Sequence, residues 1–469
     1  MSIKTLALRN FKRFDRFSID LDRGVIAILG ENSSGKSSIL KAILGLKQTV
    51  AASNEHEGWA ANGEYVDLGT YRDYIHKKDI KKAFAISLTL NADTLDPNSL
   101  MSSIVKNAAA VNLTLEYDYD SITAQARFKE IKVNFMQPAS NMSWLIQRQK
   151  TRNSYALTFS KSLIAAFKKN FPLPQSDGEL QVGEKIILQH LERFSFELDK
   201  KIGFTTYLAF RLVSENLASL SEYLEKKVFY LAPLRSSPSR SYVRSSHNLA
   251  VGVGGEHTPS VLANLESRAR KATTGHSEIR DRLDWLKKAI AKIFPGHVVA
   301  TKTYDELVKL MVSSPSTATY ASSDKSDAIT DVGFGFSQVL PILVQIAVMP
   351  HGGVLLIEQP ELHLHPVAQT RLGEVMAEAI HAGKQIIVET HSEHFVRGLQ
   401  LSVSANRKSN KLIEAISIRF YYLKRGSSSC LPLEMNEFGE LLHEWPSGFF
   451  DESYKSLRIL LANKMGDSQ

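Results

Sequence analysis

The stretch GENSSGKS, from Gly30 to Ser37, has the residue types and spacing of a loop that binds phosphate groups. It matches G-x-x-x-x-G-K-[ST] in full, and it lies between the apolar run GVIAILG and the amphipathic run SSILKAILGL. Backbone N–H groups at a helix start point toward phosphates, Lys36 adds positive charge, and the Ser37 hydroxyl can hold Mg²⁺. The alternative is an ordinary strand–helix turn. The residues expected at the phosphates are Gly30, Glu31, Asn32, Ser33, Ser34, Gly35, Lys36, Ser37 and Ser38.

A carboxylate stands at the end of a second apolar run, in LLIEQPELHLHP. If that run is a buried parallel strand, Glu358 lies at the sheet edge that also carries the phosphate loop. A carboxylate in this place suits a metal ion bound together with the phosphates. The alternative is an acidic residue near a helix N-terminus, where the helix dipole favours it.

A histidine follows a third apolar run, in QIIVETHSEHF. A strand ending before Thr390 would put the imidazole of His391 at the same edge, within reach of a terminal phosphate or an attacking water. A histidine with a purely structural role is the alternative.

A second anion site is predicted where DVGFGFSQ precedes a helix. Gly335, Ser337 and Gln338 stand at the helix start, where backbone N–H groups favour an anion. One nucleotide rarely needs two sites for its terminal phosphate in a single chain. We therefore expect this loop to complete the nucleotide pocket of a second copy, with ATP sandwiched in a symmetric dimer that could build into higher oligomers.

Taken together, these motifs resemble, in their order, the ABC-type ATPases of the SMC and RecF group, and more narrowly the overcoming-lysogenisation-like bacterial ATPases. The start LRNFKRFDRFSIDLDRGVIAILGENSSGKSSIL is similar to that group over its whole length. FYLAPLRSSPSRSY and EWPSGFFD resemble ATPase subunits found in anti-phage defence operons, such as Septu and PARIS systems. The resemblance covers residues 1–48 and 331–451 and is weaker between them.

The resemblance implies ATP and Mg²⁺ as ligands and gives individual residues a role. It places Ser37 and Glu358 on Mg²⁺, Ser337 on the γ-phosphate held by the partner copy, and His391 in the place of the switch histidine. Lys12 and Arg13 lie where the group often has a basic residue near the nucleotide. The glutamine of the group's Q-loop has no clear match, since Gln48 comes too early and DLGTYRDY contains none.

The chain departs from the group's pattern at position 359. The usual sequence is Asp for the metal and Glu for the catalytic base, whereas here Glu358 and Gln359 occupy those positions. An amide can orient water but cannot accept its proton, and loss of a general base typically costs ~10² to 10⁴ in rate. Glu361 or His391 could supply the base, or Gln359 could suffice by orienting the water. We expect slow but measurable hydrolysis and long-lived ATP-bound dimers.

The elements that position these residues follow from hydrophobic periodicity. Alternating runs at 83–90 and 111–119 predict antiparallel strands, and the stretch from Trp144 to Lys227, including EKIILQHLERFSFEL, is interpreted as helical. A further helical stretch is predicted from Ser277 to Ile293. Helices at 336–349, 366–381 and 392–404 alternate with apolar strands, which indicates parallel strands joined by crossovers.

The predicted fold class is therefore α/β, an ABC-type P-loop ATPase head split into N- and C-terminal lobes with a helical insertion between them. The expected domains are an N-terminal lobe with the phosphate loop over 1–140, the helical insertion and connecting segments over 141–330, and a C-terminal lobe over 331–469.

Composition narrows the function classes. The 469 residues include 43% hydrophobic residues, enough for a large core, and one cysteine, which excludes an internal disulfide framework. Val339–Met349 is too short for the ~20 residues of a membrane span, and the N-terminus lacks a signal-peptide pattern. The expected protein is cytoplasmic, with no membrane partner.

The formal charge of +8 is compatible with a polyanionic partner or with an ordinary solvated surface. Basic residues in the middle of the chain could line a groove that follows DNA without reading its sequence. They are Arg148, Lys150, Arg152, Lys168, Lys169, Arg235, Arg240, Arg244, Arg268, Arg270 and Lys271.

Three hypotheses for the function stay open at this point. The first is a nucleotide-gated ATPase that regulates a separately encoded effector nuclease during phage infection. The second is a RecF-like DNA-repair ATPase that acts as an ATP-dependent clamp on DNA. The third, a transporter ATPase subunit, fits poorly because such subunits carry a longer SGGQ signature.

Overall fold

The computed structural model describes residues 2–52, 58–92, 104–105, 108–137, 141–149, 154–171, 180–192, 194–198, 203–245, 249–272, 277–313, 326–409 and 417–446. The chain packs as two compact units, each assembled from separate stretches of sequence. The first unit comprises Met1–Asp22, Ser37–Tyr230 and Pro350–Val354, and the second comprises Arg23–Lys36, Leu231–Met349 and Leu355–Gln469.

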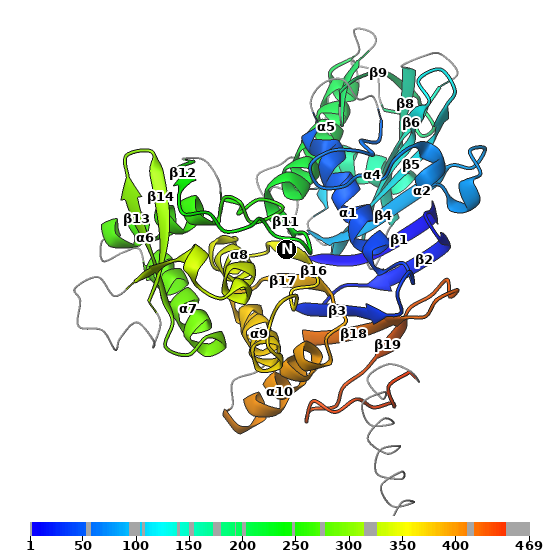
Figure 1. Cartoon of the computed structure of the whole chain (residues 1–469). Helices are drawn as coiled ribbons and strands as arrows, with labels where there is room; N and C mark the ends of the chain where they lie inside the picture. The colour runs from blue at the N-terminus through cyan, green and yellow to red at the C-terminus, as the bar shows by residue number, and fades with distance from the viewer. Residues whose placement is uncertain are drawn as a thin grey trace, which may run out of the picture. The chain divides into compact units, whose positions relative to one another are not determined.

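The first unit is built on an antiparallel sheet. Within the described residues, nine strands follow the order β10-β9-β8-β7-β6-β5-β4-β1-β2 (Figure 1). The strands are β1 (Ile3–Phe11), β2 (Phe14–Asp20), β4 (Phe84–Asn91), β5 (Ala110–Asp120), β6 (Gln125–Met136), β7 (Asn141–Arg148), β8 (Ser154–Phe159), β9 (Ile186–Glu192) and β10 (Ser195–Leu198). The helices are α1 (Lys36–Ala51), α2 (Tyr71–Tyr74), η1 (His76–Lys78), α4 (Lys161–Asn170) and α5 (Phe204–Lys227).

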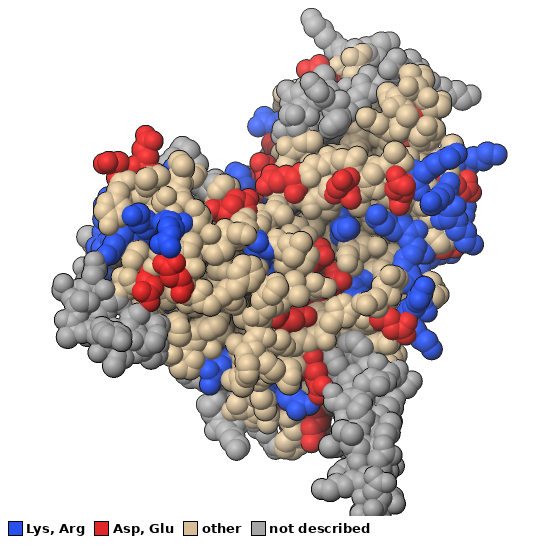
Figure 2. All heavy atoms as spheres, in the orientation of Figure 1, with Lys and Arg blue, Asp and Glu red and all other residues tan. Residues whose placement is uncertain are grey.

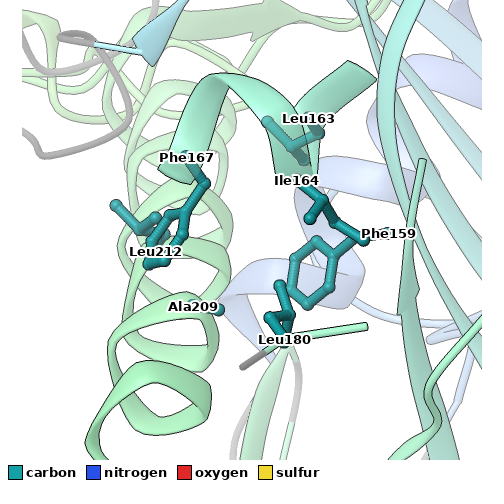
Figure 3. Close-up of a pocket in the computed structure, with 7 residues that line it drawn as sticks. All are labelled: Phe159, Leu163, Ile164, Phe167, Leu180, Ala209 and Leu212. Atoms are coloured by element: carbon teal, nitrogen blue, oxygen red, sulfur yellow. The ribbon is translucent and has the colours of Figure 1, made fainter. Parts of the chain in front are cut away.

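Aromatic and aliphatic side chains form the core of the first unit. The rings of Phe84 and Tyr117 stack with centroids 5.0 Å apart, and Trp59 meets both edge-on. Helices α4 and α5 meet across a small pocket whose lining is entirely apolar (Figure 3). The lining residues are Phe159, Leu163, Ile164, Phe167, Leu180, Ala209 and Leu212.

Helix α1, which follows the phosphate loop, is fixed in the first unit by two buried polar side chains. The Gln48 amide donates to the carbonyls of Ala60 and Val66 and accepts from the N–H groups of Tyr65 and Val66, over 2.8–3.1 Å. The Lys47 ammonium donates to carbonyls at the C-terminal end of α5. The side chain of Gln48 is thus used in holding the 60–66 segment.

The second unit contains the sheet that carries the phosphate loop. In the described residues, the strand order is β11-β16-β17-β3-β18-β19, and both β17 and β18 run parallel to β3. The strands are β3 (Val25–Gly30), β11 (Val228–Leu231), β16 (Val354–Glu358), β17 (Gln385–Glu389), β18 (Ile418–Leu423) and β19 (Leu431–Leu433), of which residues 228–230 and Val354 are counted with the first unit. Every residue of β3, β16 and β17 is buried, as expected for strands covered on both faces.

Further helices and a small antiparallel sheet complete the second unit. The helices are α6 (Thr258–Lys271), α7 (Ser277–Ile293), η4 (Ile329–Asp331), α8 (Phe334–Val348), α9 (Pro366–Glu378), η5 (Ala379–Ala382) and α10 (Glu393–Ser409). The small sheet consists of β12 (Tyr242–Val243), β13 (Val298–Tyr304), β14 (Leu307–Ser313) and β15 (Asp327–Ala328).

The α/β fold class is confirmed, and so is the alternation of strands and helices in the C-terminal part. Helices α7, α8, α9 and α10 lie where periodicity predicts them, and β17, β3 and β18 form the expected parallel core. The division into blocks at 1–140, 141–330 and 331–469 stays a prediction. No helix in the described residues is long and apolar enough to cross a bilayer.

The helical interpretation of residues 144–198 is wrong over much of its length. Strands β7, β8, β9 and β10 occupy most of the described residues there, and within 144–198 only α4 is an α-helix. Ile186 and Leu188 are buried while Ile187 and Gln189 are exposed, which is a period of two. Pairing with β8, where Tyr155 lies opposite Leu188, decides the structure over local helix propensity.

Candidate nucleotide site

The phosphate loop follows β3 with the backbone geometry that its glycines allow. Gly30 and Gly35 have φ angles of 142° and 99°, and Ser33 has a φ of 60°. A Cβ on Gly30 would lie 2.2 Å from the carbonyl oxygen of Leu423 on β18. Position 30 therefore requires glycine, and the strand–loop–helix context predicted for the motif is present.

The side chain of Lys36 folds back onto the phosphate loop. The residue is only 4% exposed, and its ammonium donates to the carbonyls of Gly30 at 3.0 Å and Glu31 at 2.8 Å. Burial lowers the pKa of Lys36, and the nearby Glu389 carboxylate opposes that effect. The positive charge is therefore held at the end of β3 by loop carbonyls. Ser37 and Ser38 follow directly in the chain, in the first turn of α1.

The ends of three strands meet beside this loop. The N–H of Gln359, after β16, donates to the carbonyl of Glu389 at 2.7 Å, and the N–H of Thr390, after β17, donates to the carbonyl of Ile28 on β3 at 3.3 Å. Strands β16, β17 and β3 are neighbours in the sheet (Figure 1). Loop 30–36, Glu358 and the Thr390–His391 pair consequently share one edge of the sheet.

Gln359 has a left-handed backbone, with a φ of 44°. Its carbonyl accepts from the guanidinium of Arg235 at 3.3 Å, and the carbonyl of Glu358 accepts from the same group at 3.2 Å. A non-glycine residue in this region of φ is held there by its surroundings. Here Arg235 and the end of β17 supply those restraints.

The assignment of Arg235 to a DNA-binding groove is corrected by these contacts. Arg235 is 6% exposed and binds the turn after β16, so it cannot present its charge to a polyanion. Its place directly after the apolar run VFYLAPL does not by itself distinguish a buried arginine from a surface one.

Glu361 and His391 join two turns of the site. The N–H of His391 donates to Oε1 of Glu361 at 2.9 Å, whereas Oε2 has no hydrogen-bond partner among the residues that the structure describes. Burial raises the pKa of Glu361, against the lowering effects of its hydrogen bonds and of Arg235. Burial, followed by the charge of Lys36, lowers the pKa of His391. The imidazole is therefore favoured in its neutral form at neutral pH.

The GFSQ residues stand at the start of α8, and that start packs on the turn after β16. The rings of Phe334 and His363 meet edge-on at 5.0 Å, and a Cβ on Gly335 would lie 2.8 Å from the carbonyl oxygen of His363. The Ser337 hydroxyl donates to the carbonyl of Phe334 at 2.7 Å, and Gln338 is buried. Contact of Ser337 with a partner copy's nucleotide stays a prediction.

The opposite end of α8 is held by two cations. Lys384 donates to the carbonyl of Ile346, and Arg282 donates to the carbonyl of Val348 at 2.9 Å. Positive charge at a helix C-terminus stabilises the helix through its dipole and satisfies terminal carbonyls. These contacts fix the helix whose N-terminus carries the GFSQ residues.

The oxygen ligands of the candidate metal site fit Mg²⁺ by their chemistry. Mg²⁺ is bound through one or two protein oxygens together with substrate phosphates, and the Ser37 hydroxyl and the Glu358 carboxylate are donors of that kind. Glu358 is 8% exposed at the end of β16.

Most of the remaining basic residues named from the sequence are on the surface. Arg148 pairs with Asp118 at 2.8 Å and Arg240 with Asp331 at 3.0 Å, so their charges are partly neutralised. Lys150, Arg152 and the last part of EWPSGFFD lie outside the described residues. The exposed basic residues are Lys168, Lys169, Arg244, Arg268, Arg270 and Lys271.

Comparison with known proteins identifies the family. A model described as "AAA ATPase domain" matches residues 1–396. The chain belongs to the AAA ATPase domain family. Nucleotide binding is what this family implies. A second model, "Protein of unknown function (DUF3696)", matches residues 413–460.

Curated relatives align over short stretches. The DNA replication and repair protein RecF of Staphylococcus haemolyticus is 31% identical over 78 residues, which are 16% of this chain and 21% of that protein. The chromosome partition protein Smc of Methanocaldococcus jannaschii is 46% identical over 44 residues, 9% of this chain and 4% of that protein. The matched stretches thus span about a fifth or less of these two relatives.

Solved structures of Smc heads also match. The alignment with the Smc head bound to the C-terminal winged-helix domain of ScpA spans 93% of this chain and 99% of the Smc head chain. The sequence identity is 12% and the TM-score is 0.42. The Smc head domain from Thermotoga maritima covers 93% of this chain and is covered in full, at 10% identity and a TM-score of 0.38.

Proposed function

We propose that this chain is an ABC-type ATPase that binds ATP with Mg²⁺, hydrolyses it slowly, and dimerises around it to regulate a separately encoded effector nuclease in anti-phage defence. The observation that carries the ATPase part is the meeting of loop 30–36, Glu358 and His391 at one sheet edge. We infer slow turnover from the amide of Gln359, which stands at the position of the catalytic base and cannot accept a proton.

The proposed roles follow from the chemistry of each group. Lys36 and the N–H groups of the loop bind the phosphates, and Ser37 and Glu358 hold Mg²⁺, which supplies charge stabilisation when bound. Gln359 orients the attacking water through its amide. Because an amide accepts no proton, turnover falls by ~10² to 10⁴ relative to a glutamate at this position.

Glu361 and His391 would take secondary roles in this scheme. The Glu361 carboxylate already accepts the His391 N–H, so its first task is to position the histidine turn. Neutral His391 can then accept a hydrogen bond from water or from a partly protonated phosphate. If Glu361 also acted as the base, its substitution would abolish the residual turnover of the wild type.

The dimer is tested by light scattering with a non-hydrolysable ATP analogue. We expect the analogue to double the molar mass of the wild type and to leave Ser337→Arg a monomer with unchanged analogue affinity. Leu401→Arg, which places the same charge at an exposed position of α10, serves as the matched control and should still double its molar mass. Doubling of the mass of Ser337→Arg, or a wild type that stays monomeric with bound analogue, would contradict the sandwich dimer.

Support for the effector part comes from the resemblance to defence ATPases. The effector part of the proposal predicts that a nuclease encoded beside this chain co-purifies with it. It also predicts that Lys36→Ala removes protection against phage in a plaque assay. Protection that persists in Lys36→Ala would show that nucleotide binding does not gate the effector.

The alternative function, a RecF-like DNA clamp, is favoured by the relative described as a DNA replication and repair protein. It predicts salt-sensitive DNA binding that requires ATP and no partner protein. DNA binding unaffected by ATP and by Lys36→Ala would remove this alternative.

A further inference from the structure

A hydrogen bond between two side chains joins helix α9 to the turn that carries His391. The Ser392 hydroxyl donates to Oε1 of Gln369 at 2.5 Å, and the amide Nε2 of Gln369 donates to the carbonyl of Leu364 at 2.9 Å. Ser392 is only 8% exposed, so its bond to Gln369 is shielded from water. The Gln369 amide therefore uses its oxygen for the turn after β17 and its nitrogen for the turn after β16.

Ser392 also fixes the backbone that follows His391. The N–H of Ser392 donates to Oγ1 of Thr390 at 3.0 Å. Its hydroxyl accepts the N–H of Phe395 at 2.9 Å, as the side chain of a helix N-cap residue does. Gln369 connects this set of hydrogen bonds to α9.

Helices α9 and α10 are in close backbone contact beside this hydrogen bond. A Cβ on Gly398 would overlap the carbonyl oxygen of Thr370, and a Cβ on Gly373 would overlap that of Phe395. Figure 2 shows side chains of both charges over the region where Figure 1 places α10. Exposed charges contribute little to stability, so the close contact at the glycines sets the position of the two helices. The oxygen of Gln369 is consequently held at a fixed place relative to Ser392.

The placement of His391 matters for the proposed reaction, because its imidazole has to reach a phosphate or the attacking water. A shift of ~1 Å in such a group can cost about 10²-fold in rate. Ser392 is the next residue in the chain, so a contact that fixes Ser392 also fixes the direction in which the imidazole leaves the backbone. Gln369 acts on this backbone through Ser392 and not on the nucleotide.

We propose that Gln369 is a positioning residue for ATP turnover, which holds the His391 turn against the turn after β16. This role rests on the proposed ATPase function and adds a residue to its site. Leu364, which accepts from the Gln369 amide, follows His363, whose ring packs on Phe334 at the start of α8. Gln369 thus ties the histidine turn to the segment that contacts the GFSQ residues.

The test compares single-turnover ATP hydrolysis by the full chain in the variants Gln369→Met and Gln400→Met. Both glutamines are partly buried, and the amide of Gln400 on α10 also donates to a backbone carbonyl, that of Gly439, at 2.9 Å. Gln400→Met is therefore the matched control and should hydrolyse ATP at the wild-type rate. We expect Gln369→Met to lower the rate constant ~10-fold or more at saturating ATP, with ATP affinity within about threefold of the wild type.

A double-mutant cycle with His391→Ala separates positioning from a general structural role. The cycle is made in the Gln359→Glu protein, whose expected faster turnover keeps slow variants measurable. Since Gln369 acts through the histidine, Gln369→Met should slow the His391→Ala protein no further. Loss of the same factor with and without His391 would overturn the proposal. So would an unchanged rate in Gln369→Met, equal losses in Gln369→Met and Gln400→Met, or a loss of ATP affinity alone.

Hydrogen exchange followed by mass spectrometry gives a readout that needs no turnover. Without nucleotide, the amides of His391 and Phe395 should exchange faster in Gln369→Met and at the wild-type rate in Gln400→Met. Unchanged exchange at the histidine turn of Gln369→Met would contradict the proposal at any rate of hydrolysis. Failure of the ATPase function gives a different result, because the wild type would then be no faster than Lys36→Ala while exchange still reports the contact.

Discussion

At the residue scale, Glu361 combines burial with a hydrogen bond between two turns of the site. The residue is 9% exposed, and its carboxylate accepts the N–H of His391, so it links the turn after β16 to the turn after β17. A buried carboxylate costs stability when ionised unless enough donors face it. Here burial is the largest effect on its pKa and raises it.

The first prediction concerns the pH dependence of stability. Because the folded-state pKa of Glu361 is raised above its ordinary value of 4.5, the stability it contributes is present below pH 4.5 and is lost as the pH rises through the raised pKa. Glu361→Gln keeps an acceptor for His391 but carries no charge. We expect its melting temperature to exceed that of the wild type increasingly from pH 5 to pH 8, as measured by differential scanning fluorimetry.

The control is Glu197→Gln, at an exposed position of β10. It should show no pH-dependent difference from the wild type. The melting temperature of Glu361→Gln could instead exceed that of the wild type by the same amount at every pH, or by less as the pH rises. Either result would mean that the hydrogen-bond donors around Glu361 affect its pKa more than burial does.

Single residues differ in how far the sequence predicts them. The phosphate loop, Glu358 and His391 could be found because each directly follows a continuous apolar run, and strand ends of a parallel core share an edge. Arg235 could not, since its role depends on two carbonyls that are 123 and 124 residues away. From the sequence alone, a buried arginine that binds backbone looks the same as a surface arginine.

At the element scale, Arg235 joins the segment after β11 to the end of β16. The second prediction is that Arg235→Met destabilises the fold by ~1–3 kcal/mol, because two buried carbonyls lose their donor. The left-handed turn at Gln359 would also loosen, so ATP turnover should fall roughly tenfold or more while ATP affinity changes less. Denaturant unfolding and single-turnover kinetics measure the two effects.

Arg240→Met is the matched control, because Arg240 is exposed and paired with Asp331. A surface ion pair contributes ~0–1 kcal/mol, so this variant should be close to wild type. If Arg235→Met lowered ATP affinity and turnover equally, Arg235 would serve binding of the nucleotide and not the geometry of the turn.

The third prediction concerns helices α1 and α5. The Lys47 ammonium donates to the carbonyls of Leu224 at 3.3 Å and Glu225 at 2.5 Å, and burial lowers its pKa to about 8. Lys47→Met should cost ~1–3 kcal/mol in unfolding free energy, since the last turn of α5 loses its donor. Lys161→Met, exposed on α4, should cost little. A more stable Lys47→Met would show that desolvation of the ammonium outweighs its hydrogen bonds.

Elements whose apolar residues follow a single clear period could be predicted from the sequence. Strands that depend on pairing with a strand far away in the sequence could not. Helix α7 lies at Ser277–Ile293 as its amphipathic pattern predicts. The run EKIILQHLERFSFEL carries apolar residues at spacings that fit either a helix or a strand, and its partner β8 lies about 30 residues earlier. Local periodicity has no information about such a partner.

At the scale of the whole molecule, the two units interleave along the chain. Strand β3 belongs to the second unit, while α1, after the phosphate loop, belongs to the first. The consecutive blocks expected over 1–140, 141–330 and 331–469 stay a prediction. The interleaving arises because the central strand β3 is inserted between β17 and β18, which come from the far end of the sequence.

The central claim is that this ATPase is slowed by an amide at the position of the catalytic base. Single-turnover ATP hydrolysis by the wild type, Gln359→Glu and Lys36→Ala tests it most directly. Lys36→Ala removes the phosphate-binding cation and sets the background, and Gln359→Glu restores a proton acceptor without a change in side-chain length.

We predict that the wild type hydrolyses ATP slowly but above the Lys36→Ala background, and that Gln359→Glu is faster by ~10² or more. A wild type that turns over as fast as Gln359→Glu would contradict the account. The base would then have to be sought at Glu361 or His391.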